Sequence, residues 1–283
     1  MARRFRAACL VVCCAQTASA LGGAAVAGVA GVTGFLGWAF QGVGPSPEAA
    51  AAVARAPPVE VSELDALLFG SRAPKVALYA GAKIRPESYA PLALELSETL
   101  DGAGVLVLQS PFNVYAFKPA TVEKVLAAYP SITCVAGHSI GGLWAAEFCR
   151  DLEDSGSWPA AGLNFFYMGV HGKSVSLEPF RDLPFGKVGW SVATEDVTFQ
   201  RCIDDDECDT SLSLAEAYIE EVSAQLPATA QISLIEGGNH EQYGSYGSPG
   251  YSKGLAYKDL VAKISAADQC AQVAAAIAAV ARD

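Results

Sequence analysis

The chemistry of this chain centres on one serine between two glycines, in the run Gly137-His138-Ser139-Ile140-Gly141. The apolar run over 132–136 before it is too short for a helix and predicts a buried strand. The composition of residues 142–149 after it favours a helix. Gly-x-Ser-x-Gly between a strand and a helix is typical of a nucleophile elbow, a strained turn that raises a serine hydroxyl above the end of a sheet. We therefore predict that Ser139 is a catalytic nucleophile.

A serine hydroxyl attacks only when a base removes its proton, and the chain offers three histidines. His138 adjoins the serine, so its side chain should leave the turn in another direction and pack or hydrogen-bond beside it. His171 precedes the position expected for the acid, which favours a place at the surface or the pocket rim. His240 lies in a glycine loop just after the last predicted strand, where a parallel sheet brings it beside Ser139. We predict that His240 is the base.

The acid of such a site lies between the serine and the histidine along the chain, at the end of a strand. Glu195 and Asp196 follow a predicted strand over 188–193 and fall in that interval. We predict Asp196 as the acid, with Glu195 in reserve, to hold the imidazole in the required tautomer. The acidic run over 204–207 lacks the spacing of a calcium loop, so we expect a solvated loop there and no metal site.

Acyl transfer also needs an oxyanion hole made of backbone N–H groups. One donor is the N–H after the nucleophile, which here belongs to Ile140. The other should come from the loop after a predicted strand over 75–80, where Gly81 permits a close turn and Ala82 supplies the N–H. Lys83 beside it is either an ordinary surface lysine or a cation that attracts an anionic substrate to the rim.

Continuous apolar strands alternate with helical segments, which predicts an α/β domain whose mostly parallel sheet is covered by helices on both faces. The 283 residues, 52% of them hydrophobic, suffice for one large domain with an N-terminal extension. The net charge of −11 argues against nucleic-acid binding, which needs clustered Lys and Arg. The predicted strands cover 75–80, 104–109, 132–136, 163–168, 188–193 and 231–235, and the predicted helices cover 86–100, 120–128, 142–149, 213–225 and 266–280.

The N-terminus has the pattern of a secretory signal peptide over 1–20, with three arginines, an apolar stretch and the cleavage sequence Ala18-Ser19-Ala20. Residues 21–40 are uncharged and about long enough to span a bilayer, which favours membrane association. Three readings stay open: a cleaved signal before a membrane or targeting segment, an uncleaved anchor, and a bipartite leader to an organelle. We expect a secretory-type route, with an extracellular or membrane-anchored protein. Residues 41–58, rich in Pro and Ala, predict a linker, and the folded domain is expected over 59–283.

Cysteines outside the signal divide into two groups. Cys134, Cys149 and Cys270 fall in predicted strands and helices, where buried free thiols are expected. Cys202 and Cys208 flank the acidic run and are expected to close a small disulfide ring in an oxidising compartment.

Several runs of this sequence occur together in one known family. They are Tyr79-Ala80-Gly81-Ala82-Lys83, Pro111-Phe112-Asn113, Gly137-His138-Ser139-Ile140-Gly141-Gly142, Thr194-Glu195-Asp196, Gly237-Gly238-Asn239-His240-Glu241-Gln242-Tyr243-Gly244 and Tyr246-Gly247. From about Lys75 to the C-terminus the sequence resembles the compact alpha/beta hydrolases of the fold-5 (dienelactone-hydrolase-like) group. The resemblance implies the alpha/beta-hydrolase fold with Ser139, Asp196 and His240 as a catalytic triad. Two departures are Ala80-Gly81, where the family more usually has His-Gly, and Val197, where a glycine usually follows the acid.

These residues predict a cofactor-free serine hydrolase that cleaves a small-molecule carboxylic ester or thioester through an acyl-enzyme intermediate. Two alternatives stay open: an acyl transferase that uses the same triad, and a non-catalytic member of the fold that binds a ligand or a protein. Phe112, Tyr115 and Phe117 follow the strand over 104–109 and are expected either to line an apolar pocket or to belong to the core.

Overall fold

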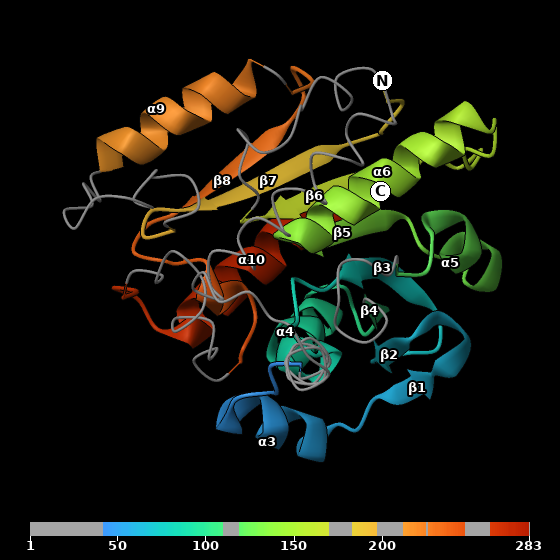
Figure 1. Cartoon of the computed structure of the whole chain (residues 1–283), viewed down its shortest axis with the longest axis horizontal. Coiled ribbons are helices and arrows are strands. Elements are labelled where there is room, and N and C mark those ends of the chain that lie inside the picture. Colours follow the sequence, from blue (N-terminus) through green and yellow to red (C-terminus); the bar gives the residue numbers. More distant parts are fainter. Residues whose placement is uncertain are drawn as a thin grey trace, which may run out of the picture.

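The computed structural model describes residues 42–109, 119–169, 183–196, 212–224, 226–246 and 261–282. Within them the chain forms a mostly parallel sheet with helices on both faces, as the alternation of elements predicts (Figure 1). The strands are β1 (Val59–Val61), β2 (Ala66–Phe69), β3 (Pro74–Tyr79), β4 (Gly104–Leu108), β5 (Cys134–His138), β6 (Asn164–Met168), β7 (Val188–Ala193) and β8 (Gln231–Ile235). The helices are α3 (Pro47–Arg55), α4 (Ala90–Thr99), α5 (Val122–Ala128), α6 (Ile140–Asp154), α9 (Leu212–Ser223) and α10 (Ala266–Ala281), with short 3-10 turns η1 (Ser62–Leu64), η2 (Pro86–Tyr89) and η4 (Glu241–Tyr243).

The sheet has eight strands in the order β1-β2-β4-β3-β5-β6-β7-β8. Strands β3 to β8 pair in parallel, whereas β2 pairs antiparallel with both β1 and β4. The register aligns Tyr79 with Gly137 at the end of β3 and β5, and Ala193 with Ile235 at the end of β7 and β8. The carboxyl ends of these strands therefore share one edge of the sheet, and the loops that follow them meet there.

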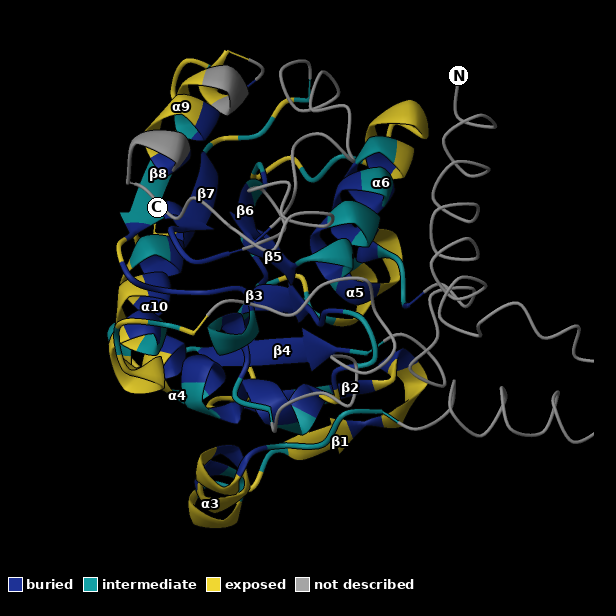
Figure 2. Cartoon of the chain, turned by 60° about the vertical axis from the view of Figure 1, so that its left-hand side comes forward, coloured by how far each residue is buried: buried dark blue, intermediate teal, exposed yellow. Residues whose placement is uncertain are grey.

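Two hydrophobic clusters sandwich the sheet. One contains side chains of α5, α6 and α9, and the other contains side chains of α3, α4 and α10. Every residue of β4, β5 and β7 is buried, because parallel strands covered on both faces have no solvent side. Figure 2 shows the buried strands between α4 and α10 on one side and α5 and α6 on the other.

The sequence missed the first elements of the fold. Strands β1 and β2 were not predicted, and the expected linker over 41–58 is wrong over 47–55, where α3 forms. The N-cap side chain of Ser46 accepts a hydrogen bond from the N–H of Ala49, and Pro47 occupies the first turn. Ala49 and Ala52 are buried against the domain. A Pro/Ala-rich composition is thus compatible with a packed helix, because alanine favours the helix and its small side chain permits close packing.

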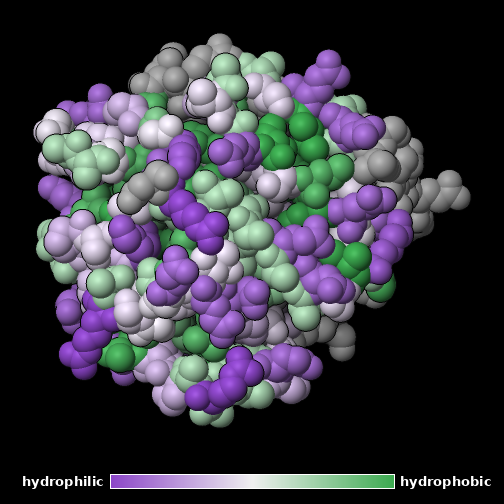
Figure 3. Space-filling view, turned by 180° about the vertical axis from the view of Figure 1, so that it is seen from behind, coloured by the Kyte–Doolittle hydropathy of each residue, from purple (hydrophilic) through white to green (hydrophobic). Residues whose placement is uncertain are grey.

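The outer surface mixes hydrophilic and hydrophobic groups. Figure 3 shows hydrophilic side chains spread over one whole face, with hydrophobic groups between them. Among the described residues, the exposed large hydrophobic side chains are Val59, with 47% of its surface exposed, and Val261, with 81%. Within the same residues, no helix combines the length and the apolar character that crossing a bilayer requires.

Candidate active site

The elbow has the strained geometry that its sequence predicts. Ser139 links β5 to α6 with φ 53° and ψ −128°, a backbone conformation that side-chain-bearing residues rarely adopt. A Cβ built on Gly141 would collide with the carbonyl oxygens of Tyr79 and Ala80 at the end of β3. A Cβ on Gly137 would collide with the backbone of Gly142 in the first turn of α6. Both glycines are therefore required for the serine to occupy the junction between strand and helix.

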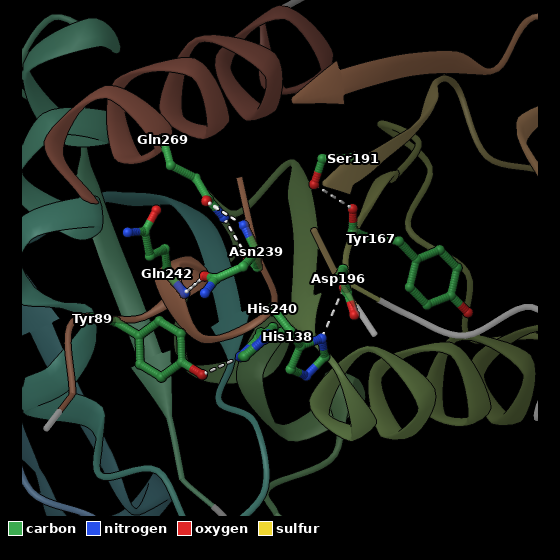
Figure 4. A network of polar contacts seen from close by, with 9 residues as sticks. All are labelled: Tyr89, His138, Tyr167, Ser191, Asp196, Asn239, His240, Gln242 and Gln269. Atoms are coloured by element: carbon green, nitrogen blue, oxygen red, sulfur yellow. Dashed lines mark hydrogen bonds and ion pairs between the residues drawn. The ribbon is translucent and has the colours of Figure 1, made fainter. Parts of the chain in front are cut away.

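His240 and Asp196 form a buried pair at the same edge of the sheet. Nδ1 of His240 lies 2.9 Å from Oδ2 of Asp196, and Figure 4 shows the two side chains directed at each other. Only 9% of His240 and 1% of Asp196 is exposed. The ring of His138, the residue before Ser139, has its centroid 4.7 Å from that of His240. The structure thus brings His240 next to the elbow that carries Ser139.

Glu195, the reserve acid, is directed elsewhere. Its Oε1 lies 2.7 Å from Nζ of Lys263 and accepts a hydrogen bond from the hydroxyl of Thr194 at 3.3 Å. Its backbone N–H donates to the carbonyl of Gly238 at 2.8 Å, which ties the end of β7 to the loop that carries His240. Of the two candidate acids, the structure therefore places Asp196 rather than Glu195 against the imidazole.

A buried amide from α10 fixes the loop that carries His240. Oε1 of Gln269 accepts from the N–H of Asn239 at 3.0 Å, while its Nε2 donates to the carbonyl of Asn239 at 2.8 Å (Figure 4). The side chain of Asn239 then accepts from the N–H of Gln242 at 2.9 Å, at the start of η4. Gln269 is completely buried, so this paired contact holds the backbone next to His240 without competition from water.

His138 occupies the place expected for it, beside the elbow and hydrogen-bonded. Its Nδ1 lies 2.8 Å from the hydroxyl of Tyr89, at the end of η2 (Figure 4). Burial lowers the pKa of His138 well below its ordinary value of 6.5, and the neighbouring His240 lowers it further. The ring is therefore neutral. Sequence reasoning missed both Tyr89 and Gln269, because a buried polar side chain inside a predicted helix gives no signal that separates it from the core.

The two predicted oxyanion donors lie at this edge as well. Ile140 is the first residue of α6, where the first N–H groups of a helix have no intrahelical acceptor. Ala82 follows β3, whose end is aligned with the end of β5. Lys83 has φ 56° and is partly buried, and this burial lowers the pKa of its ammonium group to about 8.

Other predicted residues lie outside the described part of the chain. These are His171, the pocket candidates Phe112, Tyr115 and Phe117, and the predicted disulfide pair Cys202 and Cys208. The prediction of free thiols is confirmed for Cys134, Cys149 and Cys270, and the first two are buried. Burial raises the pKa of all three thiols, so none is a reactive thiolate at neutral pH.

Comparison with known proteins agrees with the expected fold. Residues 75–162, which include the elbow, match the family model described as "Alpha/beta hydrolase family". No curated protein matches the chain significantly. The finer fold-5 subgroup stays a prediction.

Solved structures similar to this chain include three esterases. An esterase of Pyrobaculum calidifontis is 14% identical with a TM-score of 0.49, over 83% of this chain and 90% of that one. A thermostable esterase of Pseudomonas putida ECU1011 is 14% identical with a TM-score of 0.47, over 83% and 89%. Carboxyl esterase 2 of Tuber melanosporum is 14% identical with a TM-score of 0.45, over 75% and 82%. Likeness at this level does not assign a substrate.

Proposed function

We propose that this alpha/beta hydrolase cleaves carboxylic esters through an acyl-enzyme intermediate formed on Ser139. The observation that carries the proposal is the buried 2.9 Å hydrogen bond between His240 and Asp196, beside the strained turn at Ser139. A histidine held by a carboxylate next to a serine nucleophile is the arrangement that serine hydrolases use on unrelated folds.

The first step is attack of the Ser139 hydroxyl on the substrate carbonyl. Asp196 is an acceptor when ionised, so Nδ1 of His240 donates to it and the lone pair of the neutral ring lies on Nε2. That lone pair accepts the proton of Ser139 as its oxygen bonds to the carbonyl carbon. Asp196 then stabilises the imidazolium that forms and keeps its ring oriented.

The tetrahedral intermediate carries a negative charge on the former carbonyl oxygen. We assign its stabilisation to the N–H groups of Ile140 and Ala82, helped by the dipole of α6, which begins directly after Ser139. His240 next protonates the leaving alcohol, and the acyl group stays on Ser139. A water molecule then repeats the sequence as nucleophile and releases the acid.

The proposed substrate is a small ester or thioester. Lys83, next to Ala82, carries a positive charge below about pH 8, and this charge favours esters that carry a carboxylate. An acyl transferase would use the same residues, with an alcohol or amine in place of water as the second nucleophile. In a non-catalytic member of the fold that binds a ligand, Ser139, Asp196 and His240 would take part in no reaction.

Labelling with a serine-directed fluorophosphonate, followed by a panel of p-nitrophenyl and thioester substrates, tests this proposal. Wild type should be labelled and should turn over short-chain esters, whereas Ser139→Ala and His240→Ala should each lose about 10⁴-fold or more in kcat. Far-UV circular dichroism of both variants should match wild type. A wild-type protein that takes up no probe and hydrolyses no ester would favour the binding role. Product formation only when an acceptor alcohol is added would favour the transferase.

We also propose that the chain enters a translocated compartment, on the strength of the basic start and the Ala18-Ser19-Ala20 sequence. N-terminal sequencing of the native protein should find a start at or beyond Leu21, or the intact chain in a membrane fraction. A soluble cytosolic protein that begins at Met1 or Ala2 would contradict this.

A further inference from the structure

A buried tyrosine connects the oxyanion loop to the elbow. The N–H of Gly81 donates to the hydroxyl oxygen of Tyr89 at 2.8 Å, and that oxygen lies 2.8 Å from Nδ1 of His138. Tyr89 is completely buried and His138 is 1% exposed, so no solvent competes for these contacts. Gly81 precedes Ala82, and His138 precedes Ser139. The hydroxyl therefore bridges the two segments that supply the oxyanion donors.

The direction of the first hydrogen bond follows from its two groups. The backbone N–H of Gly81 can only donate, so the oxygen of Tyr89 accepts it. The second hydrogen bond joins the same hydroxyl to Nδ1 of His138, and which of the two atoms donates depends on the tautomer of the ring. Nε2 is buried without a hydrogen-bond partner among the described residues. Burial raises the pKa of Tyr89 and lowers that of His138, so the bridge stays neutral throughout the working pH range.

The Tyr89 bridge lies just beyond the last paired residues of β3 and β5, where strand pairing no longer fixes the distance between the two segments. The pairing of β3 with β5 ends at Tyr79 and Gly137, one residue before His138. Beyond this last pair, the hydroxyl of Tyr89 is what hydrogen-bonds Gly81 to His138. Gly81 and His138 are closely packed, because a Cβ built on Gly81 would lie 2.8 Å from Nδ1 of His138. The ring of His138 also packs against Tyr243, with centroids 5.4 Å apart.

We propose that Tyr89 and His138 are positioning residues that hold the N–H of Ala82 at the correct distance from the N–H of Ile140. This inference rests on the proposed ester hydrolysis. Two donors on different loops stabilise an oxyanion only when their spacing is fixed before the charge develops. A bridge one residue before each donor supplies that constraint. Tyr89 is 0% and His138 1% exposed, so we assign both an action through the backbone rather than through direct contact with a substrate.

The test is Tyr89→Phe, which removes the hydroxyl and keeps the ring. Its matched control is Tyr79→Phe, which removes another buried hydroxyl, one that donates to the carbonyl of Ala120 at 2.9 Å. Tyr89→Phe should lower kcat by about 10- to 100-fold and leave KM within about twofold of wild type. The reason is that the transition state loses more stabilisation than the bound substrate does. Tyr79→Phe should leave both constants near wild type. His138→Asn keeps an acceptor near Nδ1 and should lose less kcat than His138→Leu.

A second readout does not depend on turnover. Hydrogen–deuterium exchange of the peptide over 80–84 should be about tenfold faster in Tyr89→Phe than in wild type and unchanged in Tyr79→Phe. Equal exchange in the two variants overturns the inference even if no ester is hydrolysed. If the wild type is inactive but exchange is faster in Tyr89→Phe, only the proposed function is overturned. A rise in KM with unchanged kcat would assign Tyr89 to substrate binding and also overturn it. If Tyr89→Phe does not fold, the two His138 variants decide by the same measurements.

Discussion

Gly169, the residue after β6, lies against the imidazole of His240: a Cβ built on it would be 2.9 Å from Nδ1. The same Cβ would be 3.1 Å from Oδ2 of Asp196, so both atoms of the 2.9 Å hydrogen bond border this position. Gly169 also has φ 53°, which disfavours any side chain. The packing of the His240–Asp196 pair thus depends on a glycine that the sequence analysis did not identify.

Gly169→Ala should therefore damage the site more than the fold. We expect a loss of about 100-fold in kcat, because the methyl group displaces the imidazole from its hydrogen bond. The control is Gly162→Ala, a position with φ 81° and no heavy atom within 4 Å of the added Cβ. Both variants should lose about 1–2 kcal/mol of unfolding free energy from backbone strain. Equal activity in the two variants, measured at saturating ester, would contradict the prediction.

Asp196→Asn should lower kcat by about 10⁴-fold, because the amide cannot stabilise the imidazolium and favours the wrong tautomer. Glu195→Gln should lower it by less than about tenfold, because that side chain contacts Lys263 and Thr194 rather than His240. Steady-state kinetics of the two variants on one ester make the comparison. The reverse order of losses would identify Glu195 as the acid.

Lys83 predicts a pH-dependent preference for anionic esters. Its ammonium group has a pKa lowered to about 8 by burial, so its positive charge is present below that pH and is lost above it. KM for an ester that carries a carboxylate should therefore rise as the pH increases through 8, while KM for a neutral ester of equal size should not. Lys83→Gln should remove the difference. A ratio of the two KM values that does not change with pH would exclude this role.

His138 should make the fold less stable in mild acid. Its pKa in the folded protein is lowered below the ordinary value of 6.5, so below about pH 6.5 the unfolded chain binds a proton that the folded protein does not. The free energy of unfolding should thus decrease as the pH falls through this window, by up to about 1.4 kcal/mol per pH unit from this residue. Urea titrations at about pH 5, 6 and 7 should show that the free energy of unfolding depends less on pH in His138→Asn than in wild type. Identical slopes would show that the buried ring is not responsible.

The segment before β1 should be part of the folded domain rather than a dispensable linker. The N–H of Val43 donates to the carbonyl of Lys83 at 2.6 Å, and the N–H of Ser46 donates to that of Ser245 at 2.9 Å. A chain that begins at Val59 should lose about 2–4 kcal/mol of unfolding free energy through these bonds, together with the packing of α3. A chain that begins at Gly42 is the control. Equal thermal midpoints for the two chains would restore the linker interpretation.

The sequence by itself predicted the elbow and the histidine that the structure places beside it. A short apolar run, two glycines around Ser139 and a helix-forming segment are local features, and each predicts its element without knowledge of the rest of the chain. His240 followed from the order of the strands, because every parallel strand ends at the same edge. The central strands and helices were predicted for the same reason, since an apolar run or a helix-forming composition is a property of consecutive residues.

Only the tertiary structure decided which residues surround Ser139 and His240. Glu195 and Asp196 are neighbours with the same chemistry, and their assignment depends on Lys263 and Gly238, which reach Glu195 from other parts of the chain. Tyr89 and Gln269 have the sequence signature of ordinary core residues, and their hydrogen bonds join segments 49 and 30 residues apart. The helix α3 was predicted as a linker because prolines and alanines are typical of linkers, whereas the burial of Ala49 and Ala52 against distant elements is a property of the folded chain.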